Sequence, residues 1–203
     1  MKLICIGQNY RDHVRELNSN PTEEPLFFLK PDSAILLRQH PFVIPEFSKE
    51  VHYEVEVLVK IKKLGKYIQP KFADTYYDQI GLGIDFTARD LQRECKAKGL
   101  PWEKAKGFDG AAVIGDWVDK KEFNDLADLD FHLEKNGEVV QRGNTGQMIY
   151  TIDNLIAHVS KYMTLKIGDI LFTGTPSGVG PVAIDDSLTG FLSGRPMFAI
   201  NIK

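Results

Sequence analysis

The stretch H-Y-E-V-E-V-L-V-K, residues 52–60, decides most of the fold, together with G-L-G-I-D-F-T-A-R-D at residues 81–90. In the first stretch apolar residues alternate with polar ones, which predicts a strand with one buried and one solvated face. Glu54 and Glu56 share the polar face, roughly 6.6 Å apart along the strand. Two carboxylates at this spacing can converge on a hard cation, although on this pattern alone a solvated face is the simpler interpretation.

The second stretch adds a third carboxylate, Asp85. Its bulky residues at positions 82, 84 and 86 would point to one side of a strand, and Asp85 would lie on the other side with the glycines. Aspartate is disfavoured in strands, and flanking glycines often mark the close approach of a ligand or another backbone. Asp85 is therefore a candidate cation ligand, and a strand-end aspartate that caps a turn is the alternative.

The composition favours an ordinary globular enzyme or binding protein. A chain of 203 residues predicts one domain spanning residues 1–203. With 25 basic and 28 acidic residues, the net charge of -3 indicates neither a nucleic acid nor an anionic membrane as partner. Two cysteines are too few for a disulfide scaffold, and we find no run long enough for a signal peptide or a membrane span. We therefore expect a cytoplasmic protein.

A polar helix near the N-terminus carries a candidate general base. After an apolar strand at residues 3–6, residues 10–17 predict a short helix on which His13 and Glu16 lie on one face. A carboxylate can orient an imidazole, or can itself take a proton from water. Because the helix is polar throughout, a solvated surface is the alternative. The polar stretch 18–25 follows, where a lid would lie.

Several later segments carry clear local signals. Asp90 is placed to cap a helix over residues 91–98 that stops at Gly99, with Gln92 in its first turn. The pair Asn136-Gly137 predicts a hairpin between strands at 129–135 and 138–141. Residues 151–162 show the apolar stripe of a helix, and together with many short apolar segments these elements predict a β-rich fold.

A glycine-rich segment, T-G-T-P-S-G-V-G at residues 173–180, follows a predicted strand at 170–172. It lacks the Lys-Ser/Thr ending of a phosphate-binding P-loop and no helix pattern follows it. We interpret it as a turn in which the hydroxyl of Thr175 could face a ligand.

Taken together, these segments resemble the fumarylacetoacetate hydrolase superfamily along essentially the whole chain. The likeness is closest to single-domain members related to acylpyruvate hydrolase and oxaloacetate decarboxylase, which share the K-G-L-P-W type of segment at residues 98–102. The other matching stretches are G-Q-N-Y-R-D-H-V-R-E (7–16), F-F-L-K-P (27–31), Y-E-V-E (53–56), G-I-D-F-T-A-R-D-L-Q (83–92), K-G-F-D (106–109), N-G-E (136–138) and G-D-I-L-F-T-G-T-P-S-G-V-G (168–180).

The resemblance implies an α+β, β-rich fold, a mixed β-sandwich roll of the superfamily's C-terminal-domain type, usually assembled as a homodimer. It implies that Glu54, Glu56 and Asp85 bind Mg2+, or Mn2+ or Ca2+ in its place. The water-activating pair falls on His13 and Glu16. The residues that would assist catalysis or line the substrate pocket are Lys106, Arg89, Gln92 and Thr175. Many relatives carry arginine where this chain has Gln8, so substrate preference can differ here.

The activity implied is metal-dependent cleavage of a C–C bond in a small 2-oxo (1,3-diketo) acid, as in acylpyruvate hydrolase, through a metal-stabilised enolate. The same enolate would serve a decarboxylase or keto–enol isomerase of a 2-oxo dicarboxylic acid, such as oxaloacetate or 2-hydroxyhepta-2,4-diene-1,7-dioate. Extra basic residues in the pocket would favour this second activity. A catalytically silent binding protein is the third possibility.

Overall fold

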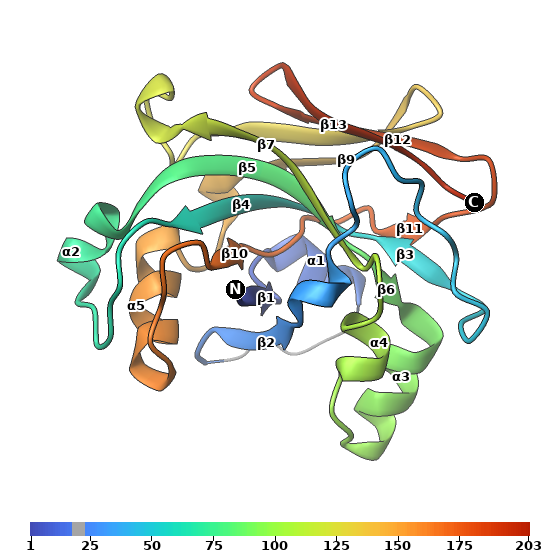
Figure 1. Cartoon of the computed structure of the whole chain (residues 1–203), viewed down its shortest axis with the longest axis horizontal. Helices are drawn as coiled ribbons and strands as arrows, with labels where there is room; N and C mark the ends of the chain where they lie inside the picture. The colour runs from blue at the N-terminus through green and yellow to red at the C-terminus, as the bar shows by residue number, and fades with distance from the viewer. Residues whose placement is uncertain (18–22) are drawn as a thin grey trace.

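In the computed structural model, which describes residues 1–17 and 23–203, strands outnumber helices (Figure 1). The strands are β1 (Leu3–Gly7), β2 (Leu26–Lys30), β3 (Val51–Tyr53), β4 (Val55–Ile61), β5 (Tyr77–Asp85), β6 (Thr87–Ala88), β7 (Ala112–Asp119), β8 (Asp130–Lys135), β9 (Glu138–Asn144), β10 (Ile170–Phe172), β11 (Gly180–Pro181), β12 (Ser187–Leu192) and β13 (Arg195–Asn201). The helices are α1 (Arg11–Glu16), α2 (Pro70–Ala73), α3 (Arg89–Lys98), α4 (Glu103–Lys106) and α5 (Ile152–Tyr162).

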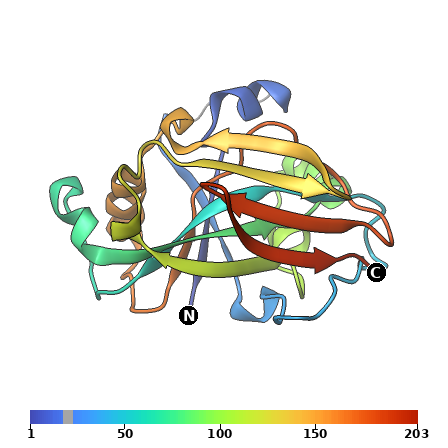
Figure 2. The same ribbon diagram turned by 90° about the horizontal axis from the view of Figure 1, so that it is seen from above.

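The described strands form three sheets. The largest has the order β2-β1-β10-β4-β5-β7, in which only β1 and β10 run parallel. A four-stranded sheet, β13-β12-β8-β9, crosses over it (Figure 2), and a small sheet, β11-β3-β6, extends it at one end. The mixed, β-rich α+β fold expected from the sequence is confirmed.

The strand around the two glutamates differs from the expectation in two ways. It is interrupted at Glu54, because β3 pairs within the three-stranded sheet whereas β4 pairs with β10 and β5. The prediction of one solvated face is also wrong, because every residue of β4 except Lys60 is buried. Glu56 of β4 lies in a buried cluster of carboxylates instead of facing water.

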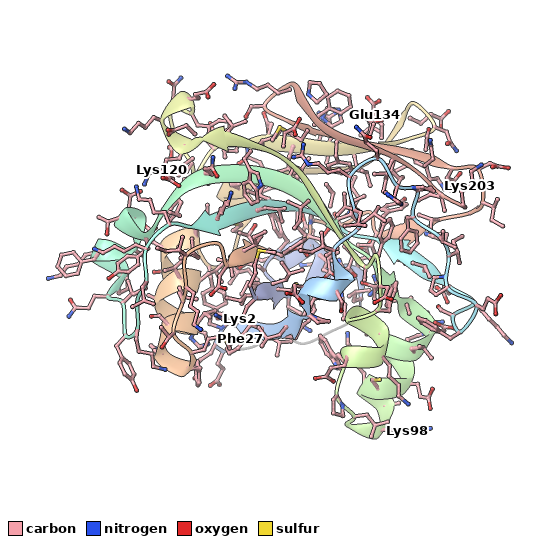
Figure 3. All side chains as sticks on the ribbon, viewed as in Figure 1. Lys2, Phe27, Lys98, Lys120, Glu134 and Lys203 are labelled. Atoms are coloured by element: carbon pink, nitrogen blue, oxygen red, sulfur yellow. The ribbon has the colours of Figure 1, made fainter. Side chains whose placement is uncertain are left out.

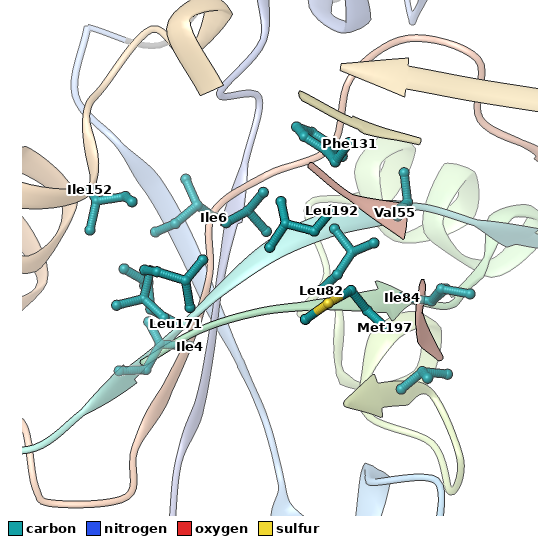
Figure 4. Close-up of a cluster of buried hydrophobic side chains, with 14 of the residues drawn as sticks. Ile4, Ile6, Val55, Leu82, Ile84, Phe131, Ile152, Leu171, Leu192 and Met197 are labelled. Atoms are coloured by element: carbon teal, nitrogen blue, oxygen red, sulfur yellow. The ribbon is translucent and has the colours of Figure 1, made fainter. Parts of the chain in front are cut away.

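The main apolar core lies between the large sheet and the four-stranded sheet and extends to helix α5. Figure 4 shows Leu82 and Ile84 of β5 beside Met197 of β13, with Leu192 of β12 close to them. All four side chains are buried. Each such side chain contributes about 1.5–3 kcal/mol to folding, and this packing fixes the position of the strands that carry the acidic residues.

Local turn and cap signals are confirmed. Asn136 and Gly137 have φ angles of 55° and 83°, as the tight hairpin between β8 and β9 requires. Gly99 ends α3 with a φ of 64°. The side chain of Thr151 caps α5 by accepting from the N–H of Asn154.

The role expected for Asp90 as an N-cap is wrong. Helix α3 begins two residues earlier than expected, and its N-cap is Ala88, whose side chain makes no capping bond. The carboxylate of Asp90 accepts instead from the Ser48 hydroxyl at 2.7 Å and from the Lys49 N–H at 2.9 Å. An acidic residue in the first turn still suits the helix dipole, and here it also anchors the loop before β3.

Local sequence patterns are insufficient for several further segments. The short apolar segments at 34–37 and 42–44 form single bridges rather than strands, and strands β7, β12 and β13 had no clear sequence signal.

Most of the expected lid, residues 18–22, lies outside the described residues. No helix of the described chain is long and apolar enough to cross a membrane. Charged side chains such as Lys98 and Lys203 lie at the periphery (Figure 3).

Candidate active site

Three carboxylates meet in the interior. One oxygen each of Glu54, Glu56 and Asp85 lies within 4.8 Å of the other two, and the residues are 5%, 1% and 1% exposed. Glu54 lies where the chain passes between sheets, Glu56 lies two residues later on β4, and Asp85 ends the adjacent strand β5. Antiparallel pairing of β4 and β5 therefore brings together acidic residues that are about thirty positions apart.

Two cationic side chains lie against this cluster. The Lys106 ammonium is 2.9 Å from Oε2 of Glu54 and 2.8 Å from Oδ2 of Asp85, and Arg89 Nη2 is 2.5 Å from Oε1 of Glu54. Burial by itself raises the pKa of Glu54, but the charges of Lys106 and Arg89 outweigh it and hold that pKa below its ordinary value. Burial lowers the pKa of Lys106, but Asp85 and Glu54 raise it to about 12.

Lys30 provides a third buried cation, which sequence reasoning did not single out. Its Nζ lies 2.7 Å from Oδ1 of Asp85, yet it donates to the backbone carbonyls of Phe86, Lys106 and Ala111 at 3.1, 2.5 and 3.0 Å. An ammonium has three N–H groups, so the contact with Asp85 is an ion pair without a hydrogen bond. Oδ1 of Asp85 is consequently a buried acceptor that has no donor in the described chain.

Glu56 is the least compensated of the three carboxylates. It accepts one hydrogen bond, from the N–H of Gly174 at 2.7 Å, and it has no ion-pair partner in residues 1–17 and 23–203. Burial, followed by the charges of Asp85 and Glu54, raises its pKa well above the ordinary value. An under-compensated buried carboxylate, an orphaned aspartate oxygen and an all-oxygen donor set fit a hard divalent cation.

The structure also brings together the predicted dyad. His13 Nδ1 lies 2.9 Å from Oε2 of Glu16, and the other oxygen of Glu16 accepts from the N–H of Gly178 at 2.9 Å. His13 is buried and lines the cavity beside the carboxylates, whereas Glu16 does not line it. The solvated-surface alternative for this helix face therefore does not hold for His13.

The cavity around these groups has a volume of about 30 Å³, which is room for roughly one or two water molecules. Arg89, Gln92, Lys106 and Thr175 all line this cavity. A larger cavity of about 480 Å³ near Tyr77 contains none of the predicted site residues.

All four of these lining residues already form hydrogen bonds within the protein. Arg89 Nη1 donates to Oε1 of Gln92 at 2.7 Å. The hydroxyl of Thr175 donates to the carbonyl of Val55 at 2.9 Å and accepts from Nε2 of Gln141 at 3.0 Å. Thr175 thus faces the cavity while its hydroxyl is engaged by the backbone and by Gln141.

The cavity has further lining residues that the sequence analysis did not identify as site residues. Lys96, Phe28 and Trp102 line the cavity, and Lys96 follows Gln92 by four residues, a helical spacing that could have drawn attention to it. Gln8 also lines it, with an unusual φ of 60° and a buried Oε1 that lacks a partner among the described residues. The backbone donors at Gly174 and Gly178 have no sequence signature beyond the glycines themselves.

Comparison with known proteins places this geometry in context. The chain is 41% identical over 201 residues to oxaloacetate tautomerase FAHD1, mitochondrial, of Homo sapiens, covering 99% of this chain and 91% of that protein. It is 42% identical over 182 residues to oxaloacetate decarboxylase, mitochondrial, of Dictyostelium discoideum, covering 89% and 84%. Fumarylpyruvate hydrolase from Pseudomonas aeruginosa, solved with Mn2+ and pyruvate, superposes with a TM-score of 0.93 at 31% identity, covering 100% and 89%.

The family match covers nearly all of the sequence. Residues 2–199 match the family described as fumarylacetoacetate (FAA) hydrolase C-terminal, and the relatives above are enzymes that process small oxo acids. The likeness stated from sequence is thereby confirmed: this chain belongs to the fumarylacetoacetate hydrolase C-terminal family.

Proposed function

We propose that the protein catalyses the cation-dependent keto–enol tautomerisation of a small dicarboxylic 2-oxo acid of the oxaloacetate class. It is the second of the activities that the family resemblance implies. The names of the relatives from Homo sapiens and Dictyostelium discoideum support oxaloacetate as the substrate type. The physical support is the number of basic groups around the cavity.

The observation that carries the proposal is the position of Lys96. Residues 89, 92 and 96 fall on one face of α3, so that Arg89, Gln92 and Lys96 all face the cavity. Arg89 is already paired with Glu54 and bonded to Gln92. The Lys96 ammonium lies 5.4 Å from the ring centre of Trp102 and has no anionic partner among the described residues, so it is available for a second substrate carboxylate.

The carboxylates Glu54, Glu56 and Asp85 would hold the cation, with Mg2+ as our expectation and Mn2+ supported by the Pseudomonas structure. When bound there, the cation supplies a Lewis acid that favours the enolate form of the substrate. His13 would move the proton: because Nδ1 is directed at Glu16, Nε2 is the nitrogen left to take a proton from the substrate C3. The Lys106 ammonium would stabilise charge on the 2-oxygen.

Hydrolysis of an acylpyruvate is the second candidate, and the dyad favours it. A histidine held by Glu16 could deprotonate a water that attacks the distal carbonyl, with Lys106 supporting the charge that develops. The hydrolase from Pseudomonas aeruginosa solved with pyruvate supports this reaction class. A homodimer and a cytoplasmic location remain our predictions, although the relatives from Homo sapiens and Dictyostelium discoideum are named as mitochondrial.

A substrate screen tests the proposal. Purified protein with Mg2+ or Mn2+ is assayed on three substrates: oxaloacetate, acetylpyruvate and a hydroxymuconate-type diacid. With oxaloacetate, enol absorbance and CO2 release are both measured. We expect rapid, chelator-sensitive equilibration of enol and keto oxaloacetate. Cleavage of acetylpyruvate without tautomerisation of oxaloacetate would replace the first candidate by the second, and inactivity on all three would favour a binding protein.

A further inference from the structure

The buried side-chain amide of Gln141 links the four-stranded sheet to strand β4 of the large sheet. Gln141 belongs to β9 of the four-stranded sheet, and it is 1% exposed. Its Oε1 accepts from the N–H of Val55 at 2.9 Å. Its Nε2 donates to the hydroxyl of Thr175 at 3.0 Å and to the carbonyl of Pro176 at 3.1 Å. The side chain therefore joins the residue between the two glutamates to the loop that follows β10.

The reason for this arrangement is that the pairing between β10 and β4 ends before it reaches Glu56 and Glu54. Strands β10 and β4 pair in register only as far as Phe172 opposite Leu58. Thr173 still donates to the carbonyl of Val57 from its N–H and its hydroxyl, at 3.1 and 2.9 Å. The chain then turns at Gly174, which has a φ of 98° and directs its N–H to Glu56.

The turn at Gly174 leaves the Val55 peptide groups without a strand partner. Both the N–H and the carbonyl of Val55 point to the side that β10 has left, and Val55 is fully buried. Buried peptide groups that lose their partners are strongly unfavourable. Gln141 satisfies the N–H, and Thr175, itself bonded to Gln141, satisfies the carbonyl. These two side chains replace the missing strand.

We propose that Gln141 is a positioning residue for the cation site. By fixing the Val55 peptide it would set the separation of Glu54 and Glu56, and by holding residues 175 and 176 it would keep the Gly174 N–H on Glu56. The proposal rests on the cation site proposed above. A purely structural role would stabilise the fold without affecting cation affinity, and this difference can be measured.

Titration calorimetry of chelator-treated protein with MnCl2 alone provides the test. Gln141→Met keeps the length of the side chain and removes all three hydrogen bonds. We expect Mn2+ affinity to fall about 10- to 100-fold, as for other residues that orient metal ligands. The matched control is Leu133→Val, because Leu133 lies opposite Gln141 in the pairing of β8 with β9 and is fully buried but makes only packing contacts. The Leu133→Val protein should be less stable than the wild type but should bind Mn2+ with wild-type affinity.

A second pair of variants keeps the test decisive if Gln141→Met does not fold. Thr175→Val removes the hydroxyl bridge and should weaken Mn2+ binding, whereas Thr175→Ser retains the hydroxyl and should bind like the wild type. Wild-type affinity in a folded Gln141→Met protein, or in Thr175→Val where Gln141→Met does not fold, overturns the positioning role alone. Absence of Mn2+ binding by the wild-type protein overturns the cation site, and the role of Gln141 with it.

Discussion

Oε1 of Glu16 accepts a 2.9 Å hydrogen bond from the backbone N–H of Gly178, a residue 162 positions away in the sequence. The φ of Gly178 is 97°, and a Cβ there would lie 2.7 Å from the carbonyl oxygen of Val140, so the position requires glycine. The same loop directs the N–H of Gly174 at Glu56. One glycine-rich loop therefore holds both the proposed dyad and a proposed cation ligand.

The Glu16 carboxylate separates hydrolysis from decarboxylation. Glu16→Ala should remove general-base assistance and lower acetylpyruvate hydrolysis by about 10² to 10⁴. Oxaloacetate decarboxylation depends chiefly on the cation and should suffer less. Initial rates on both substrates, with cation affinity measured alongside, check this. Equal losses at unchanged cation affinity would mean that the dyad closes the site or places the substrate.

Lys96 should determine the preference for a second carboxylate. Lys96→Met should raise the KM for oxaloacetate about tenfold, equivalent to roughly 1.4 kcal/mol of binding, and should affect the monocarboxylate acetylpyruvate much less. Steady-state kinetics on the two acids measure the ratio. The control is Lys98→Met on the same helix, because Lys98 pairs with Glu94 and does not line the cavity. An equal rise in KM for both acids would refute the assignment.

Lys30 should matter chiefly for stability. Replacing it by methionine leaves the charge of Asp85 less compensated and three backbone carbonyls without their donor, which should cost about 3–5 kcal/mol. Urea unfolding of Lys30→Met measures this. Lys203→Met, at an exposed ion pair with Asp185, should change stability by at most about 1 kcal/mol. Similar midpoints for both variants would contradict the proposed role.

The metal-free protein should lose stability as pH rises because of Glu56. Its pKa is raised in the folded state, so the folded protein binds this proton more tightly than the unfolded chain. The resulting stability is fully present below about pH 4.5 and is lost as pH rises toward the folded pKa. Denaturation in chelator from pH 5 to 8 should therefore show a steeper decline for wild type than for Glu56→Gln, by up to about 1.4 kcal/mol per pH unit. Parallel curves would contradict this.

What could be predicted from sequence was local. The hairpin at Asn136-Gly137 depends on two adjacent residues that accept positive φ, and the shared face of Glu54 and Glu56 follows from strand periodicity. The family resemblance then predicted that Asp85 joins Glu54 and Glu56 in one cation site. Strands β12 and β13 were missed because their pairing is set by packing on β5 and β7, which no local pattern reports.

The residues that support the site could not be predicted for the same reason. The carbonyls that bind Lys30 lie 56, 76 and 81 positions away in the sequence, and Gln141 meets Val55 across 86 positions. In isolation the first resembles a solvated lysine at a strand end and the second an ordinary polar strand residue. Only the fold shows that both are buried against the peptide groups around the carboxylates.

The cation site is the claim on which the proposed chemistry depends, and calorimetry tests it most directly. Chelator-treated wild-type protein and Glu56→Ala are titrated with Mg2+ and with Mn2+ under identical conditions. If Glu54, Glu56 and Asp85 hold the ion together, the wild type binds about one equivalent and the variant shows no comparable binding. Equal binding by the two proteins would contradict the assignment of this cluster as the cation site.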